Sequence, residues 1–206
     1  MIELELKYLL KTNHYQEFFK DVDGFPVVDD YYDTDDYSLL KNGNFLRNRN
    51  NKKIDFKLYA GDDSHLFCEE TSFNSDSFNS ENAALLKTLK ALGIDKGVNF
   101  KTFEEYVRSN NLMLLCKVDK NRKVLKLENI IISLDTVENL GVFLEAEMHF
   151  DDTNFNKDEA QVLIEKTLVD MGLIDVELDH KVTIGYVELF LKRDNYEAYL
   201  LGKYHD

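Results

Sequence analysis

Residues 2–7 read Ile2-Glu3-Leu4-Glu5-Leu6-Lys7, and they alternate apolar and charged side chains with a period of two. This period predicts a half-buried β-strand, because successive side chains of a strand point to opposite faces. One face of the predicted strand is apolar, and the other carries Glu3, Glu5 and Lys7. The stretch therefore predicts a sheet that packs one face against a core and gathers charged groups on the other.

The same alternation returns further along the chain, in residues 54–58, 130–135 and 144–149. We interpret these three segments as further strands of the sheet. The last of them places Glu145 and Glu147 on one face, as the first strand does with its own two glutamates. The sequence thus predicts at least two strands that carry paired carboxylates.

Helix signals separate the predicted strands, with Gly93 and Gly172 as stop signals for two of the helices. Many antiparallel strands with a few outer helices indicate an α+β protein built around a sheet or barrel, in one domain over residues 1–206. The helix signals lie in residues 14–22, 77–92, 156–172 and 183–190, and the coil-rich stretches are residues 29–36, 48–53, 61–64 and 151–156. The acidic residues of the first coil-rich stretch are expected to form a solvated turn.

The chain has 25 lysines and arginines against 39 aspartates and glutamates, so its formal net charge is −14. This charge argues against a nucleic-acid binder and against docking on an anionic membrane, since both need a basic face. The cysteines, Cys68 and Cys116, fit no metal or disulfide spacing and are expected to be free thiols of a reducing compartment. The acidic start lacks a secretion signal and no apolar run is long enough to span a bilayer, which favours a cytoplasmic location.

The positive charges are sorted by segment as well. They stand at Lys41, at Arg47 and Arg49 two residues apart, at Lys57, and in residues 117–123. A solvated sheet face is the simplest reading of any one charged strand, but such a face usually mixes its signs. If the polar faces turn inward, converging carboxylates form an oxygen-ligand site for Mg²⁺ or Mn²⁺, and the surrounding cations match an anion with several charges.

Several motifs follow one another in the order of a known family. The sequence resembles the CYTH superfamily, the triphosphate tunnel metalloenzymes, over residues 2 to about 191. The resemblance rests on the Glu-x-Glu-x-Lys pattern of residues 3–7, on Tyr31-Tyr32-Asp33-Thr34, Leu39-Leu40-Lys41-Asn42-Gly43, Leu46-Arg47-Asn48-Arg49, Lys57, Lys120-Asn121-Arg122, the segment 134–147 and the segment 181–189 with Tyr186.

The resemblance implies a closed eight-stranded antiparallel β-barrel, with several outer helices and a tunnel that holds a triphosphate and one or two divalent ions, Mg²⁺ or Mn²⁺. By position it implies that Tyr31 and Lys57 act as a catalytic pair on the leaving phosphate, and it makes Asp135 a further acidic candidate. The implied metal ligands are Glu3, Glu5, Glu145 and Glu147, and the implied phosphate-binding residues are Lys7, Lys41, Arg47, Arg49, Lys57, Lys120, Arg122 and Lys181.

Three points stay open at this stage. Residues 65–71 lack the arginine that the family often has on the corresponding strand, so either Glu69 or Glu70 points inward. His149 shares a face with Glu147, and it either extends the site or sits at the barrel mouth. The oligomeric state is open between a monomer and a homodimer.

The resemblance leads to a first hypothesis of a divalent-metal-dependent hydrolase of a small triphosphate, either inorganic tripolyphosphate or an organic compound such as thiamine triphosphate. An alternative is a class IV-like adenylyl cyclase that makes cyclic AMP and pyrophosphate from ATP, although the His-Phe pair typical of that branch is missing before Glu3. A further alternative is a non-catalytic module that binds polyphosphate. In all three the partner is a small molecule inside the barrel, so the net charge of −14 constrains only the outer surface.

Overall fold

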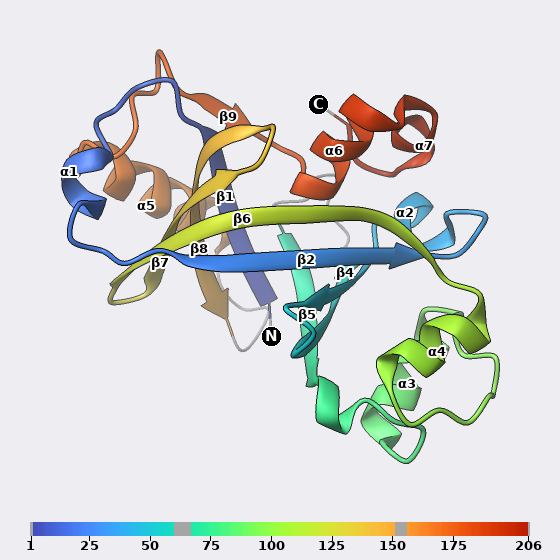
Figure 1. The fold of residues 1–206 in the computed structure, drawn as a ribbon. Helices are drawn as coiled ribbons and strands as arrows, with labels where there is room; N and C mark the ends of the chain where they lie inside the picture. Colours follow the sequence, from blue (N-terminus) through green and yellow to red (C-terminus); the bar gives the residue numbers. More distant parts are fainter. Residues whose placement is uncertain (1, 60–66, 151–155, 206) are drawn as a thin grey trace.

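The computed structural model describes residues 2–59, 67–150 and 156–205, and Figure 1 shows its fold. The strands in this part of the chain are β1 (Ile2–Leu9), β2 (Phe25–Asp33), β3 (Phe45–Arg49), β4 (Lys53–Tyr59), β5 (Phe67–Asn74), β6 (Met113–Leu127), β7 (Ile130–Val137), β8 (Gly141–Phe150) and β9 (His180–Val182). The helices are α1 (Gln16–Phe19), α2 (Ser38–Lys41), α3 (Ala83–Ala91), α4 (Phe103–Asn110), α5 (Lys157–Asp170), α6 (Tyr186–Asp194) and α7 (Tyr196–Leu201), with a short 3₁₀ turn η1 (Ser75–Ser77).

The strands form one antiparallel sheet that closes on itself. Their order is β5-β4-β3-β2-β6-β7-β8-β1, and β5 pairs again with β1, where Glu3 lies opposite Cys68. The short β9 pairs with β1 beyond β5, so that Lys7 lies opposite Val182. The prediction of an α+β fold around a closed eight-stranded antiparallel barrel is confirmed, and β9 is an addition to it.

The alternating segments are confirmed as β1, β4, β7 and β8, but part of the predicted coil was wrong. Residues 29–33 are the second half of β2, and within residues 48–53 only residues 50–52 lie between β3 and β4. The reason is visible in Val27-Val28-Asp29-Asp30-Tyr31-Tyr32, where similar residues come in pairs and hide the period of two. The predicted coil at residues 61–64 and at 151–155 falls outside the described residues.

The helix predictions are confirmed with shifted ends. The side chain of Asn156 caps α5 as predicted, by accepting hydrogen bonds from the backbone of Asp158 and Glu159. The helix expected from residue 77 begins only at Ala83, because Asn82 supplies its cap. The helix expected from residue 183 is α6 and starts at residue 186, the one expected over residues 14–22 is the short α1, and α4 and α7 were not predicted.

Two apolar clusters cover the outside of the barrel. Outward side chains of β1, β7 and β8, such as Leu6 and Leu144, pack under α5 around Ile164. Outward side chains of β3 and β4 pack against α3 and α4, where Phe56 stacks on Phe78. These helices lie on different sides of the barrel in Figure 1. They fix the apolar faces of the strands outward and therefore turn the charged faces inward. No helix among the described residues has the length and hydropathy needed to cross a membrane.

A third apolar cluster fills one end of the barrel interior. Inward side chains of the strands, among them Phe45 and Phe143, pack there against residues of α6 and α7, including Tyr186 and Tyr199. On several inward rows the charged residues give way to apolar ones toward this end, as in the step from Arg49 and Arg47 to Phe45 on β3. The barrel interior is therefore a cavity with an apolar floor and a charged wall.

Candidate functional site

A cavity of about 150 Å³ occupies the charged part of the barrel. The mouth of the cavity is marked by its two most exposed basic side chains, Lys53 and His149, which are 42% and 35% exposed. Gly185 and Tyr186 at the start of α6 lie at the floor. The remaining lining residues come from inward rows of the strands and are Glu3, Glu5, Lys7, Tyr31, Arg47, Arg49, Lys57, Glu70, Lys120, Arg122, Glu145 and Glu147.

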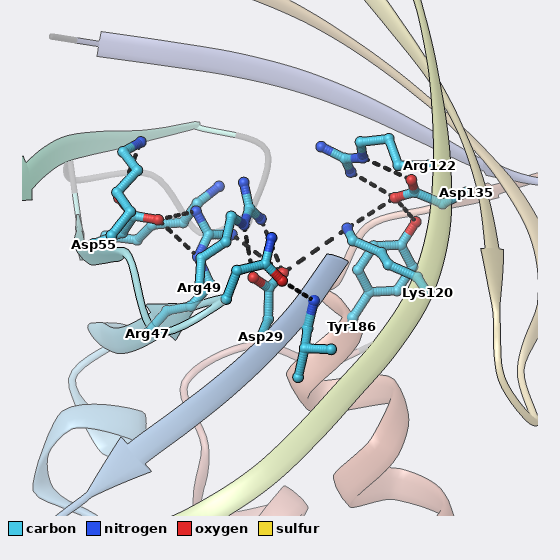
Figure 2. A network of polar contacts seen from close by, with 12 residues as sticks. Asp29, Arg47, Arg49, Asp55, Lys120, Arg122, Asp135 and Tyr186 are labelled. Atoms are coloured by element: carbon cyan, nitrogen blue, oxygen red, sulfur yellow. Dashed lines mark hydrogen bonds and ion pairs between the residues drawn. The ribbon is translucent and has the colours of Figure 1, made fainter. Parts of the chain in front are cut away.

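Two arginines of β3 are held by buried aspartates on the neighbouring strands. Arg47 donates from Nε and Nη2 to Asp55 Oδ2 on β4, at 3.0 and 2.6 Å. Arg49 forms a bidentate pair with Asp29 on β2, at 2.7 and 2.9 Å. Such paired contacts fix the plane of a guanidinium group and leave its remaining N–H groups directed elsewhere. Both arginines line the cavity, so these N–H groups suit an anion inside it (Figure 2).

A third buried aspartate, Asp135 on β7, holds the cations of β6. It accepts hydrogen bonds from Lys120 Nζ at 2.8 Å, from Arg122 Nε and Nη2 at 2.6 and 2.5 Å, and from the Tyr186 hydroxyl at 3.0 Å. The Tyr186 ring also lies 4.5 Å from the ammonium groups of Lys7 and Lys120, measured to its centroid. In Figure 2, dashed lines join the three aspartates to the cations that they fix. We refer to these cations, Arg47, Arg49, Lys120 and Arg122, as the cationic wall.

The carboxylates face this wall from β1 and β8. The register of these strands places Glu3 opposite His149, Glu5 opposite Glu147, and Lys7 opposite Glu145. We refer to the four glutamates as the carboxylate wall.

Two glutamates of the carboxylate wall, Glu5 and Glu145, are compensated by Lys7 and Arg122. Lys7 Nζ lies 2.7 Å from Glu5 Oε1 and 3.2 Å from Glu145 Oε1. Arg122 also pairs with Glu145. Glu5 and Glu145 are therefore engaged by Lys7 and Arg122.

The other two glutamates of the carboxylate wall, Glu3 and Glu147, lie beside His149. Lys57 Nζ lies 2.6 Å from Glu3 Oε1. The Nε2 atom of His149 lies 3.2 Å from Glu147 Oε2 and 3.7 Å from Glu3 Oε2. One ligand atom from each of Glu3, Glu147 and His149 lies within 4.8 Å of the others. Carboxylate oxygens and imidazole nitrogens are common ligands of divalent ions, so the residues at the mouth fit a metal ion.

The electrostatic field of the cavity lowers the pKa of two of its glutamates, Glu145 and Glu3, despite their burial. Burial raises the pKa of Glu145, but Lys7, Lys120 and Arg122 outweigh it, and the pKa lies well below its ordinary value. The pKa of Glu3 is lowered in the same way, chiefly by Lys57. Hydrogen bonds to Glu147 and Glu3 raise the pKa of His149 to about 10.

The protonation of the predicted catalytic pair follows from the same field. Burial raises the pKa of Tyr31 to about 12. The pKa of Lys57 lies well above its ordinary value, because Glu3 and other acidic groups outweigh the effect of burial. At neutral pH the phenol of Tyr31 and the ammonium of Lys57 therefore both hold their protons. By contrast, burial and Arg122 lower the pKa of Lys120 to about 8.

The structure brings most of the sequence-predicted site residues together in the cavity, but not Lys41 or Lys181. Lys41 is exposed at the end of α2. Lys181 lies opposite Tyr8 on β1, whose side chain faces outward, and Lys181 Nζ donates to Glu165 at 3.2 Å. The residues that line the cavity as predicted are Glu3, Glu5, Glu145, Glu147, Lys7, Arg47, Arg49, Lys57, Lys120, Arg122 and Tyr31.

Several residues of the site were not identified from the sequence. Asp29 was expected in a solvated turn, which was wrong: it is 1% exposed and faces Arg49. Asp33, from the same stretch, is fully buried and accepts hydrogen bonds from the backbone N–H groups of Thr34, Leu39 and Leu40, so it holds the start of α2.

Two further points concern β4 and β5. Asp55 supports Arg47 and was recognised only as a polar strand residue. The open choice on β5 is resolved in favour of Glu70, which lines the cavity, whereas Glu69 is exposed. The alternation of the strands could have identified both aspartates. Asp29 stands two residues before Tyr31, and Asp55 two residues before Lys57, so each shares an inward face with a residue that had been assigned to the site.

Solved structures share this fold at low sequence identity. A protein of Pyrococcus horikoshii has a TM-score of 0.62 and 21% identity, over 93% of this chain and 99% of that chain. A candidate adenylyl cyclase of Hippeastrum, reported with a dominant triphosphatase activity, has a TM-score of 0.62 and 16% identity, over 93% and 95%. A candidate adenylate cyclase of Vibrio parahaemolyticus has a TM-score of 0.55 and 17% identity, over 92% and 98%.

The comparison with curated proteins gave no match. The sequence itself, however, fits a family description over most of its length. The CYTH domain matches residues 1–168, which include β1 to β8 and every strand residue that lines the cavity. The chain therefore belongs to the CYTH domain family.

Proposed function

We propose that this protein is a divalent-metal-dependent hydrolase of a small triphosphate, either inorganic tripolyphosphate or an organic triphosphate such as thiamine triphosphate. The observation that carries the proposal is the pairing of two unlike walls in one cavity. Arginines and lysines, fixed by Asp29, Asp55 and Asp135, face the carboxylates of β1 and β8. A polyphosphate that is bridged to carboxylates by a divalent ion satisfies both walls at once.

The shape of the cavity supports a small ligand that is held by one end. A volume of about 150 Å³ above an apolar floor suits a few phosphoryl groups, with the rest of a larger substrate at the mouth. The enclosed site also explains how a protein with a net charge of −14 can accept a polyanion, since the ligand meets local cations. The triphosphatase activity reported for the Hippeastrum protein agrees with this choice.

The residues of the chain have distinct roles in this proposal. Arg47, Arg49 and Arg122 bind phosphate oxygens with the N–H groups that their aspartates leave available. Lys57 and Tyr31 keep their protons at neutral pH and stabilise the charge that develops on the leaving phosphate. A divalent ion held by the carboxylate wall supplies charge neutralisation and lowers the pKa of water bound to it.

The cyclase alternative has one observation in its favour, namely the names of two structural neighbours. It uses the same cavity but a different nucleophile, the ribose 3′-hydroxyl of ATP, and it yields different products. The third alternative, a binding module, predicts capture of the same ligands without turnover.

The test is a product assay on tripolyphosphate, thiamine triphosphate and ATP, each with Mg²⁺ and with Mn²⁺. Orthophosphate as the product supports the hydrolase, cyclic AMP with pyrophosphate supports the cyclase, and tight binding without product over hours supports the binding module. Glu5→Gln and Glu145→Gln are expected to abolish turnover while the protein stays folded. Glu69→Gln, at an exposed position on β5, is the matched control and is expected to keep full activity. Full turnover by both cavity variants would remove Glu5 and Glu145 from the metal-binding and catalytic residues.

A further inference from the structure

The four glutamates of the carboxylate wall are not equivalent. Glu5 and Glu145 are engaged by Lys7 and Arg122. At the mouth, Glu147 contacts His149, which is its only ion-pair partner within the described part of the chain. Glu3 uses Oε1 for Lys57 and turns Oε2 toward His149. The structure therefore divides the four glutamates that the resemblance implied as ligands of one or two divalent ions into two pairs with different partners.

The mouth has the composition and access of a metal site in its own right. The two carboxylates and the imidazole come from adjacent antiparallel strands, with Glu3 directly opposite His149. Their ligand atoms lie within 4.8 Å of one another, so a single ion between them needs small side-chain movements and takes the place of the proton that His149 holds in the ion-free site. The side chain of His149 is 35% exposed, which gives an ion a route from solvent.

We propose that Glu3, Glu147 and His149 bind one divalent ion at the mouth of the cavity, and that His149 makes this site select transition-metal ions over Mg²⁺. Mg²⁺ prefers oxygen ligands, whereas Mn²⁺, Co²⁺ and Zn²⁺ also accept an imidazole nitrogen, Co²⁺ more strongly than Mn²⁺. A site of two carboxylates and one imidazole therefore binds Mg²⁺ more weakly, and Co²⁺ more strongly, than a site of three carboxylates would. The inference rests on the proposed function for the catalytic role of the ion, whereas metal binding by these three residues is independent of it.

The first experiment measures binding of Co²⁺ and Mg²⁺ alone by isothermal titration calorimetry, without any phosphate ligand. His149→Ala is expected to weaken Co²⁺ binding about tenfold or more and Mg²⁺ binding less than about threefold, because only the nitrogen ligand is lost. His149→Glu restores a third ligand as oxygen, so it is expected to reverse the preference toward Mg²⁺. His180→Ala, at an exposed histidine on β9, is the matched control and is expected to change neither affinity.

The second experiment asks whether a nitrogen atom is bound to the ion. Pulsed electron paramagnetic resonance of the Mn²⁺-loaded protein is expected to show a ¹⁴N coupling that disappears in His149→Ala and persists in His180→Ala. Thermal unfolding of each variant checks that the ¹⁴N coupling does not disappear merely because the protein has unfolded. A Mn²⁺-loaded wild type without ¹⁴N coupling overturns the inference, and so does an equal loss of Co²⁺ and Mg²⁺ affinity in His149→Ala.

These outcomes separate the inference from the proposed function. Hydrolysis of tripolyphosphate by a protein with no nitrogen ligand on its ion would leave the hydrolase in place and overturn the role of His149. A ¹⁴N coupling in a protein that turns over no triphosphate would do the reverse.

Discussion

The two walls of the cavity are both charged, but their charges are stabilised in different ways. Each arginine of the cationic wall is fixed through two donor atoms to a buried aspartate: Arg47 to Asp55, Arg49 to Asp29 and Arg122 to Asp135. The outer carboxylates of the opposite wall are not held by paired contacts of this kind: Glu3 pairs with Lys57, and Glu147 pairs with His149. The arginines of one wall are thus fixed by aspartates outside the binding surface, whereas the carboxylates of the other are paired with side chains that themselves line the cavity.

This difference has an energetic meaning. A buried ion pair contributes little net stability, since desolvation offsets its attraction, but the loss of one member leaves a buried charge uncompensated. The aspartates behind the cationic wall should therefore be costly to remove and should act on ligands through the arginines that they orient. The carboxylates at the mouth should be less important for folding and more important for metal binding.

The largest expected effect is on stability, at the aspartate with the most partners. Asp135→Asn removes the charge that compensates Lys120 and Arg122 in a fully buried position. We expect the free energy of unfolding to fall by about 3–5 kcal/mol, because two cations are left buried beside a neutral amide. Urea denaturation measures this. Asp30→Asn on β2, a half-buried position, is the control and should stay near the wild type. A loss below about 1 kcal/mol in Asp135→Asn would contradict the argument.

A smaller effect concerns the pH dependence of stability at Asp55. Burial raises its pKa, but Arg47, Ser72 and Lys53 outweigh it and lower the pKa from 3.8 to about 2. The folded-state pKa lies below the unfolded one, so this carboxylate stabilises the fold above about pH 4 and loses its effect as the pH falls toward 2. The difference in unfolding free energy between wild type and Asp55→Asn is therefore expected to shrink by about 2 kcal/mol between pH 5 and pH 2.

Urea titrations at several pH values test this expectation. Asp76→Asn, at an exposed position in η1, is the control and should follow the wild-type curve. A gap between wild type and Asp55→Asn that is independent of pH would mean that the pairing with Arg47 does not stabilise the ionised carboxylate.

A kinetic effect is expected at Asp29, which orients Arg49 through both of its carboxylate oxygens. Asp29→Asn leaves the cavity more positive, so the affinity for tripolyphosphate should hold or rise. The guanidinium loses its fixed plane, so kcat should fall about tenfold, the equivalent of one weakened charged hydrogen bond. Steady-state kinetics separates the two constants, with Asp30→Asn as the neighbouring control. A rise in KM at unchanged kcat would mean that Asp29 serves binding rather than orientation.

The contrast between the walls also explains what the sequence could reveal. Glu3, Glu5 and Lys7 alternate with leucines, so their shared face was predictable from period alone. Asp29 was hidden, because its strand carries residues in like pairs and its segment is rich in aspartate. The helix α4 was missed although Thr102 and Glu105 have the spacing of a capping box: Thr102 Oγ1 accepts from the Glu105 N–H, and the Glu105 carboxylate accepts from the Lys101 N–H. The sequence therefore contained a local signal for the start of α4, but this helix is short and has coil around it.

Other features depend on register and closure, which no local pattern encodes. The choice between Glu69 and Glu70 was set by the pairing of β5 with both β4 and β1. Similarly, the position of Lys181 depends on which face of β1 its partner Tyr8 occupies. Both are long-range pairings, so a motif that matches in sequence can still lie outside the cavity.

The smallest expected effects are those of Lys41→Ala and Lys181→Ala, and they define where the cationic wall ends. Lys41 is exposed, and Lys181 pairs on the outside with Glu165, a half-exposed contact of the kind that contributes about 0–1 kcal/mol. Exposed charges are largely screened beyond about 8 Å at physiological salt, so neither lysine should affect a ligand inside the barrel strongly. We expect less than about a twofold change in kcat/KM for tripolyphosphate, and no difference from wild type at high salt. Lys57→Ala, in the cavity, is the contrasting variant and should lose most activity. A tenfold loss in Lys181→Ala that persists at high salt would place β9 in the wall and shift its boundary to the outer edge of β1.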